Sequence, residues 1–174
     1  YFSELCIEAG FPAGVINILH GTGPEVGAPL VNHPHVKAIS FTGGTKTGEA
    51  IARVAAPQFK KLSLELGGKN ATLVFADCDF EKTVNETVRA AFSNQGQICL
   101  CGSRILVESS IYDKFKQAFV ERVRTIQVGD PLSENSRMGA IVSKPHMEKV
   151  LSYIELAKEE GGQVLCGGNR IYPE

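Results

Sequence analysis

A cysteine in a polar, glycine-containing loop is the feature of this sequence best suited to covalent chemistry. Residues 94–103 read Asn-Gln-Gly-Gln-Ile-Cys-Leu-Cys-Gly-Ser, which places Cys99 beside amide side chains that can donate hydrogen bonds. An ionised thiol is a strong nucleophile and forms covalent adducts with carbonyl carbons. The alternative is a small buried side chain, which is the usual position of a lone cysteine. The polar flanks argue against burial more strongly for Cys99 than for Cys101.

A carboxylate in an apolar strand is the second candidate. Glu65 lies between two leucines in a predicted strand that ends in two glycines. A buried carboxylate is costly unless it is paired or used, and in poorly solvated surroundings it can serve as a general base. Two alternatives carry about the same weight. Glu65 can form an ion pair with Lys61 or Lys69, or strand alternation can simply expose it to solvent.

Two glycine-rich turns could bind a dinucleotide. Residues 43–48, Gly-Gly-Thr-Lys-Thr-Gly, follow a predicted strand and open a predicted helix. Free backbone N–H groups and the helix dipole at such a turn favour a pyrophosphate, although a turn that needs glycine only for its geometry is equally consistent. Residues 21–27, Gly-Thr-Gly-Pro-Glu-Val-Gly, are similar to a dinucleotide fingerprint. They are one residue too long and lack the acidic residue about twenty positions onward, which favours a structural turn there.

The composition excludes several classes of function. The chain has 174 residues with 18 basic and 19 acidic side chains, so no basic excess favours nucleic acid or an anionic membrane. No run of about eighteen apolar residues predicts a membrane span. The five scattered cysteines do not suggest a disulfide framework, and we expect a reducing, cytoplasmic location. Cys99 and Cys101 have no second ligand pair at a useful spacing, so we predict no metal site.

The elements that must position these residues alternate between strands and helices, which predicts an α/β fold with a parallel, doubly wound, Rossmann-like sheet. We place a candidate boundary between two α/β units at Gly67 and Gly68. The predicted strands cover residues 15–19, 36–41, 61–66, 71–75, 104–108 and 163–166. The predicted helices cover residues 25–31, 44–56, 79–92 and 112–126, with a last helix capped by Ser143 and stopped at residues 161–162.

Two of these segments resemble the signatures of the aldehyde dehydrogenase superfamily. They are Leu-Glu-Leu-Gly-Gly-Lys at 64–69 and Phe-Ser-Asn-Gln-Gly-Gln-Ile-Cys at 92–99, with the cysteine thirty-four residues after the glutamate. Phe41-Thr42-Gly43 with Gly48 is similar to the cofactor turn of that family, and residues 12–15 and 21–24 match its upstream pattern. The resemblance covers essentially the whole chain.

The resemblance implies that Cys99 is the nucleophile and Glu65 the general base in the oxidation of an aldehyde to a carboxylic acid. The thiolate would form a thiohemiacetal, with its oxyanion held partly by the Cys99 backbone N–H, and loss of hydride to the nicotinamide would leave a thioester. Glu65 would then activate the hydrolytic water. We expect NAD as the cofactor, with NADP as the alternative. The implied cofactor contacts are Gly21 near the adenine, Gly43, Gly44, Thr45 and Gly48 at the pyrophosphate, and the Leu66 carbonyl at the nicotinamide.

The resemblance also implies a division into the second half of a cofactor-binding domain (residues 1–67) and the first part of a catalytic domain (68–174). Members of the family are much longer. Their upstream oxyanion-hole asparagine, their ribose-binding lysine and glutamate, and their downstream glutamate at the nicotinamide ribose have no counterparts here. Gly44 also stands where the family commonly has serine. We therefore expect a fragment that is nearly inactive alone, from a parent protein that forms homo-oligomers.

The substrate branch and the reaction have alternatives. Residues 61–65 and the Cys-Leu-Cys context are most similar to the branch that oxidises 2-aminomuconic and hydroxymuconic semialdehydes, with betaine-aldehyde-type and general aliphatic enzymes as alternatives. A non-catalytic nucleotide-binding or structural module is an alternative function. Such a module needs neither Cys99 nor Glu65, so the presence of both residues speaks against it. A CoA-acylating dehydrogenase would transfer the thioester to a thiol, whereas Glu65 favours hydrolysis.

Overall fold

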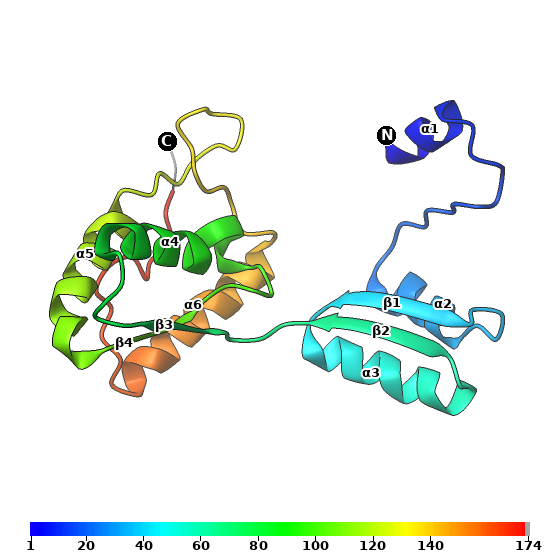
Figure 1. Ribbon diagram of the computed structural model, residues 1–174. Coiled ribbons are helices and arrows are strands. Elements are labelled where there is room, and N and C mark those ends of the chain that lie inside the picture. The colour runs from blue at the N-terminus through cyan, green and yellow to red at the C-terminus, as the bar shows by residue number, and fades with distance from the viewer. Residues whose placement is uncertain (173–174) are drawn as a thin grey trace. The chain divides into compact units, whose positions relative to one another are not determined.

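The computed structural model describes residues 1–172 and divides into two compact units, Tyr1–Gly67 and a second unit from Gly68 onward. Each unit contains a two-stranded parallel sheet with helices (Figure 1). Parallel strands need a crossover connection, which a helix supplies in both units. The predicted α/β class is confirmed.

The first unit is built around strands β1 (Ala38–Gly43) and β2 (Lys61–Leu66), paired in parallel with Ala38 opposite Lys61. Helix α3 (Thr45–Ala55) connects them, followed by the 3₁₀ turn η2 (Ala56–Gln58). Before the sheet come α1 (Phe2–Glu8), the π-turn η1 (Gly23–Gly27) and α2 (Ala28–Asn32). Along β2, half-buried leucines alternate with exposed residues, as expected for a strand with one covered face.

A buried lysine holds α2 in the first unit. Lys60 is 8% exposed, and its ammonium group donates hydrogen bonds to the carbonyls of Val31 and His33 at the end of α2. The carboxyl end of a helix carries partial negative charge and unsatisfied carbonyls, so a cation is well placed there. The residue immediately before β2 therefore ties α2 to the sheet.

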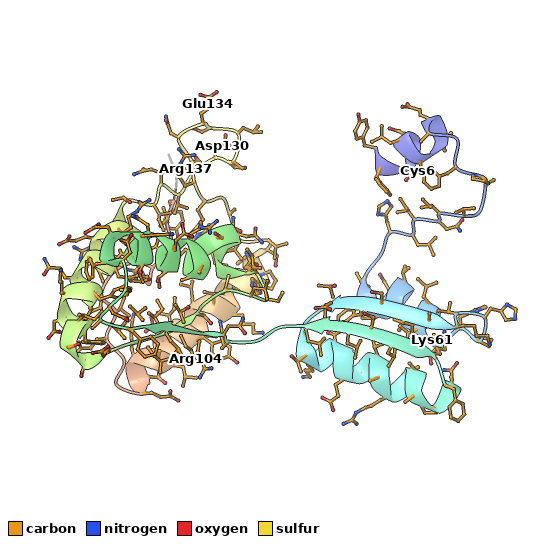
Figure 2. All side chains as sticks on the ribbon, in the orientation of Figure 1. Cys6, Lys61, Arg104, Asp130, Glu134 and Arg137 are labelled. Carbon is orange, nitrogen blue, oxygen red and sulfur yellow. The ribbon has the colours of Figure 1, made fainter. Side chains whose placement is uncertain are left out.

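The second unit is built around β3 (Ala71–Val74) and β4 (Arg104–Val107), paired in parallel with Ala71 opposite Arg104. Figure 2 labels Arg104, the first residue of β4. Helix α4 (Phe80–Phe92) and the 3₁₀ turn η3 (Ser93–Gly96) lie between the strands in sequence. The 3₁₀ turn η4 (Ser109–Ile111), α5 (Tyr112–Arg124) and α6 (Lys144–Glu159) follow. Ser143 accepts a hydrogen bond from the His146 N–H at 3.4 Å, which confirms the predicted cap.

The core of the second unit lies between α4, α5 and β3. Val74, Val84 and Phe115 are buried, and the Phe115 ring packs against Phe80 and Phe119 with centroid separations of 6.1 and 6.0 Å. This core fixes the orientation of α4, whose carboxyl end leads into the loop with Cys99. Among the described residues, no helix is long and apolar enough to cross a membrane.

Two predicted strands are wrong. Residues 15–19 and 163–166 have apolar strand-forming sequences, but neither segment forms a strand. Most of their apolar side chains are exposed, with Val15 63% and Leu165 47% exposed. A strand is stable only when a neighbour satisfies its backbone N–H and C=O groups, and neither segment has such a neighbour within its described unit.

Candidate active site

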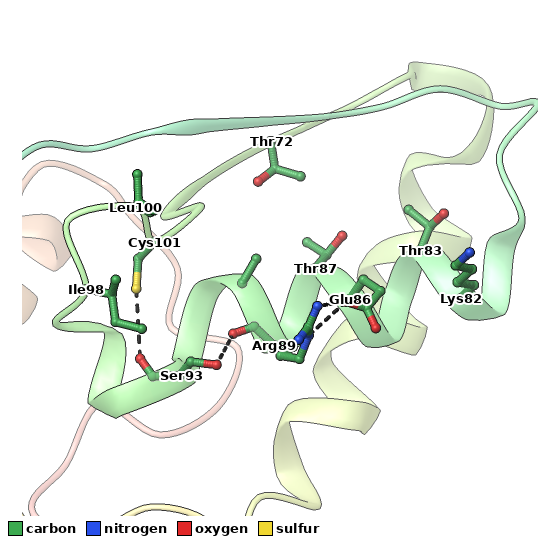
Figure 3. A pocket seen from close by; sticks show the side chains of 11 residues that line it. Thr72, Lys82, Thr83, Glu86, Thr87, Arg89, Ser93, Ile98, Leu100 and Cys101 are labelled. Atoms are coloured by element: carbon green, nitrogen blue, oxygen red, sulfur yellow. Dashed lines mark hydrogen bonds and ion pairs between the residues drawn. The ribbon is translucent and has the colours of Figure 1, made fainter.

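The loop after α4 presents one cysteine to solvent and hides the other. Cys99 is exposed, whereas Cys101 is 6% exposed and its Sγ lies 3.9 Å from the Ser93 carbonyl oxygen (Figure 3). The predicted difference between the two thiols is confirmed. Cys99 therefore has the accessibility that a nucleophile needs.

A run of left-handed residues turns the chain between α4 and Cys99. Asn94 and Gln95 have φ values of 49° and 55°, and Gly96 follows with 70°. Non-glycine residues in this region cost about 1–3 kcal/mol each and concentrate at active sites and ligand clamps. The Gln97 N–H donates to the Asn94 carbonyl at 3.0 Å. With the Gln95 amide oriented to suit its neighbours, its oxygen accepts from the Gly139 N–H at 3.3 Å.

The other side of the loop is anchored to β3 and α4. The Asn70 side-chain amide donates to the Cys99 carbonyl at 2.7 Å, and the Gly102 N–H donates to the Ala90 carbonyl at 3.1 Å. A Cβ atom at Gly102 would lie 2.2 Å from Thr72 Oγ1, so only glycine fits there without a shift. No local sequence pattern predicts this role for Asn70, because the bond spans 29 residues.

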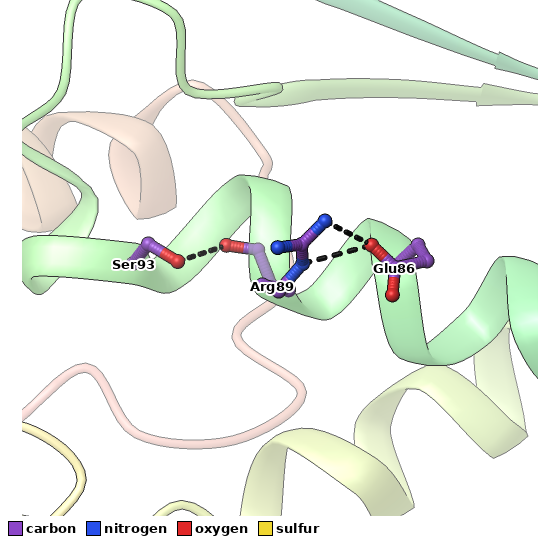
Figure 4. A network of polar contacts seen from close by, with 3 residues as sticks. All are labelled: Glu86, Arg89 and Ser93. Carbon is purple, nitrogen blue, oxygen red and sulfur yellow. Dashed lines mark hydrogen bonds and ion pairs between the residues drawn. The ribbon is translucent and has the colours of Figure 1, made fainter.

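A hollow of about 830 Å³ lies between α4 and residues 98–101 (Figure 3). Cys101 contributes to its wall, but Cys99 does not. Two polar contacts lie along this wall: Arg89 donates through Nε to Glu86 at 2.8 Å, and Ser93 Oγ donates to the Arg89 backbone carbonyl at 2.7 Å (Figure 4). Ile98 and Leu100, on either side of Cys99, also line the hollow, so it lies beside the predicted nucleophile without including it.

Glu65 is exposed within the first unit. That unit alone does not provide the poorly solvated surroundings that would suit a general base. The two-residue period of β2 puts Glu65 on the face that also carries Lys61, opposite the half-buried leucines. Among residues 1–172, no ion pair joins Glu65 to Lys61 or Lys69. Of the alternatives drawn from the sequence, strand alternation describes this side chain. Glu65 and Cys99 belong to different units.

The start of α3 is suited to an anion. Gly44 is the residue before the helix, Thr45 is its first residue, and both are exposed together with Gly43. The first backbone N–H groups of an eleven-residue helix have no partner within the helix, and the dipole places partial positive charge there. Nothing lies within 4 Å of a Cβ position at Gly44, so this approach is open.

The other predicted cofactor residues differ in their surroundings. Gly48 is buried, and a Cβ there would lie 2.6 Å from Leu66 Cδ2, so Gly48 allows close packing of α3 on β2 rather than a direct phosphate contact. Leu66 is the last residue of β2 and pairs with Gly43. Gly21 lies in an exposed turn in which its Cβ would meet Val26 Cγ2 at 2.2 Å.

Comparison with known proteins decides the family. The model of the aldehyde dehydrogenase family matches residues 1–174. The chain belongs to the aldehyde dehydrogenase family. The family resemblance inferred from the two signatures is thereby confirmed.

Relatives within the aldehyde dehydrogenase family cover nearly the whole chain. A mouse (Mus musculus) protein named 2-aminomuconic semialdehyde dehydrogenase is 53% identical over 166 residues, which are 95% of this chain and 34% of that protein. A zebrafish (Danio rerio) 4-trimethylaminobutyraldehyde dehydrogenase A is 47% identical over 171 residues, 98% of this chain and 34% of that protein. The chain thus spans about a third of the length of these relatives.

A solved structure in the same family has the same fold. The crystal structure of betaine aldehyde dehydrogenase from Staphylococcus aureus, in complex with NAD+, matches with a TM-score of 0.95 and 42% identity. The match covers 99% of this chain and 34% of that chain. The predicted aldehyde dehydrogenase fold, present here in part, is confirmed.

Proposed function

We propose that this chain supplies the nucleophile and the general base of an NAD-dependent aldehyde dehydrogenase that converts an aldehyde to a carboxylic acid. The observation that carries the proposal is the exposed Cys99 thiol, displayed by a strained loop that is anchored on both sides. Membership of the family and the NAD+ complex of the Staphylococcus aureus relative support it. In this proposal the first unit is the second half of the cofactor-binding domain, and the second unit is the first part of the catalytic domain.

The Cys99 thiolate would begin the reaction by adding to the carbonyl carbon of the aldehyde. The resulting thiohemiacetal carries an oxyanion, which the Cys99 backbone N–H can stabilise. Loss of hydride from the former carbonyl carbon leaves a thioester on Cys99. Glu65 then takes a proton from water, the water oxygen attacks the thioester carbonyl, and the acid leaves as the Cys99 thiolate is restored. The exposed side chain of Glu65 is reachable by water.

The start of α3 fits the pyrophosphate of a dinucleotide. Gly43, Gly44 and Thr45 offer exposed backbone at a helix amino terminus, and glycine at position 44 leaves the approach unobstructed. Bound NAD would supply the hydride acceptor. Gly21 and the Leu66 carbonyl are proposed to lie toward the adenine and the nicotinamide, respectively, and Gly48 to let α3 pack closely on β2.

We propose a muconic semialdehyde as the substrate class. The 53% identity to the mouse 2-aminomuconic semialdehyde dehydrogenase, against 47% to the zebrafish trimethylaminobutyraldehyde enzyme, supports this choice. An acidic semialdehyde and a quaternary ammonium aldehyde carry opposite charges. The order of kcat/KM values of the intact protein on these two kinds of substrate therefore tests the class. A preference for the cationic aldehyde would refute it.

The cell location and assembly are part of the same proposal. Five free cysteines suit a reducing compartment such as the cytoplasm. We propose a homo-oligomer for the intact protein and near-inactivity for residues 1–174 alone. Aldehyde-dependent NADH formation by the isolated chain at the rate of the intact protein would contradict the last point. Acceleration of turnover by CoA would favour the acylating alternative over hydrolysis.

The decisive experiment compares two cysteine variants of the intact protein. Cys99→Ala should abolish aldehyde-dependent NADH formation, because the covalent step is lost. Cys166→Ala, at a half-buried cysteine of the same unit, should keep the activity within about twofold, as expected for a substitution away from the site. Equal activity of the Cys99 variant and the unmodified protein would overturn the proposed mechanism.

A further inference from the structure

We infer that Asn70 is a positioning residue for the nucleophile, an inference that rests on the proposed role of Cys99. Its side-chain Nδ2 donates a hydrogen bond of 2.7 Å to the carbonyl oxygen of Cys99 itself. The two residues lie 29 positions apart, so the bond reports the folded second unit and not a local turn. Asn70 lies directly after the first signature, residues 64–69, and is not part of either signature.

The backbone around Asn70 is held by the sheet of β3 and β4. Asn70 immediately precedes β3, and its own carbonyl accepts the Arg104 N–H at 3.1 Å, which extends the pairing of β3 with β4. The Arg104 side chain donates through Nε to the Lys69 carbonyl at 3.0 Å. The backbone on both sides of Asn70 is therefore tied to the sheet, and its short side chain has little freedom to follow a moving loop.

The acceptor lies at the centre of a tight turn. The Cys101 N–H donates to the Ile98 carbonyl at 3.0 Å, which closes a turn with Cys99 and Leu100 at its centre. In such a turn the central peptide can rotate while the closing bond stays intact, and this rotation distinguishes turn types I and II. The oxygen of that central peptide is the Cys99 carbonyl. Asn70 holds it in one orientation.

This restraint acts on the reacting atoms through Cys99. Fixing the Cys99 carbonyl restrains the ψ angle of Cys99 and ties its Cα to β3, so the Cys99 side chain projects from a defined position. On the other side, the left-handed residues Asn94 and Gln95 lead into the loop without bonding to Cys99. A misplacement of about 1 Å at a reacting group can cost about a hundredfold in rate. Asn70 is thus expected to affect the chemical step more than substrate binding.

The test uses Asn70→Ala and Asn70→Asp in the intact protein, with Asn32→Ala as the matched control. Asn32 donates the same kind of bond, from Nδ2 to the Ala28 carbonyl at 2.9 Å, but in the first unit. The aspartate has nearly the same shape as asparagine but cannot donate when ionised. Both Asn70 variants should lower kcat by about 10- to 100-fold and change KM for the aldehyde and for NAD by less than about threefold. The control should change neither.

Hydrogen exchange provides a readout that needs no catalysis. Both Asn70 variants should speed exchange of the amides at 97–102, with exchange in α5 unchanged as a check that the second unit is folded. Wild-type kcat in Asn70→Asp, or unchanged exchange at 97–102 in both variants, would overturn the inference. Faster exchange in a protein that oxidises no aldehyde even when unmodified would uphold the restraint on the loop and refute the proposed function instead.

Discussion

The core of the second unit allows a prediction with two matched substitutions. Phe115 is 2% exposed and packs against two other aromatic rings, whereas Phe75, in the same unit, is 60% exposed. Phe115→Ala removes a fully buried ring and leaves a cavity, which costs about 3–5 kcal/mol. Full burial of a phenylalanine contributes about 1.5–3 kcal/mol, so the two-fifths that Phe75 buries should cost about 0.6–1.2 kcal/mol on truncation to alanine.

Urea unfolding of the 174-residue chain, followed by circular dichroism, measures both free energies. Because each variant changes one side chain, we expect nearly the same surface exposed on unfolding and hence the same m-value. The midpoint shift should then be about four times larger for Phe115→Ala than for Phe75→Ala. Phe115→Leu, with a smaller cavity and a loss of about 1–2 kcal/mol, keeps the comparison measurable if the alanine variant is unfolded without urea. Equal shifts at the two phenylalanines would refute the packing described for α4 and α5.

Three further predictions test other parts of the structure. Lys60→Met should lower the free energy of unfolding of the first unit by about 2–4 kcal/mol in urea, because two carbonyls at the end of α2 lose a charged donor. Lys61→Met, at the exposed neighbouring residue, should change this free energy by less than about 0.5 kcal/mol. Asp79→Ala should cost about 0.5–2 kcal/mol in the same assay, since the Asp79 side chain caps α4. Hydrogen bonds from the Ser110 hydroxyl and a backbone N–H lower the pKa of Glu108 from its ordinary value of 4.5. The stability that these bonds add is therefore complete above about pH 4.5, and it is lost as the pH falls through the lowered pKa of Glu108 in the folded chain. The unfolding midpoint should therefore fall less between pH 7 and pH 3 in Glu108→Gln than in the unmodified chain, and an identical fall would contradict this.

Periodicity and capping predicted most of the fold from the sequence. The strand at residues 61–66 coincides with β2, and the predicted helix at 79–92 differs from α4 by one residue. The apolar residues of these two elements repeat with a clear period, and each element packs against another that lies nearby in the sequence. The segments at 15–19 and 163–166 have the composition of strands but no neighbour within their units, and composition alone cannot supply the missing hydrogen bonds.

The candidate site was predictable only where its signals are local. Cys99 is exposed and Cys101 buried, as their flanking residues indicate. The sequence left the burial of Glu65 open, because an apolar run does not bury every residue of a strand. The two-residue period of β2 turns Glu65 to the exposed face. The bond from Asn70 to Cys99 has no sequence signal, because it depends on the parallel pairing of β3 with β4.

The most direct test of the proposed mechanism is to trap the thioester. Glu65→Gln in the intact protein should still form the covalent adduct with Cys99 but should hydrolyse it slowly, by about 10²–10⁴-fold. After mixing with NAD and an aldehyde and rapid acid quenching, peptide mass spectrometry should find the acyl group on Cys99 and on none of the other four cysteines. An adduct on another cysteine, or none in the presence of continuing NADH formation, would contradict the assignment of Cys99 and Glu65.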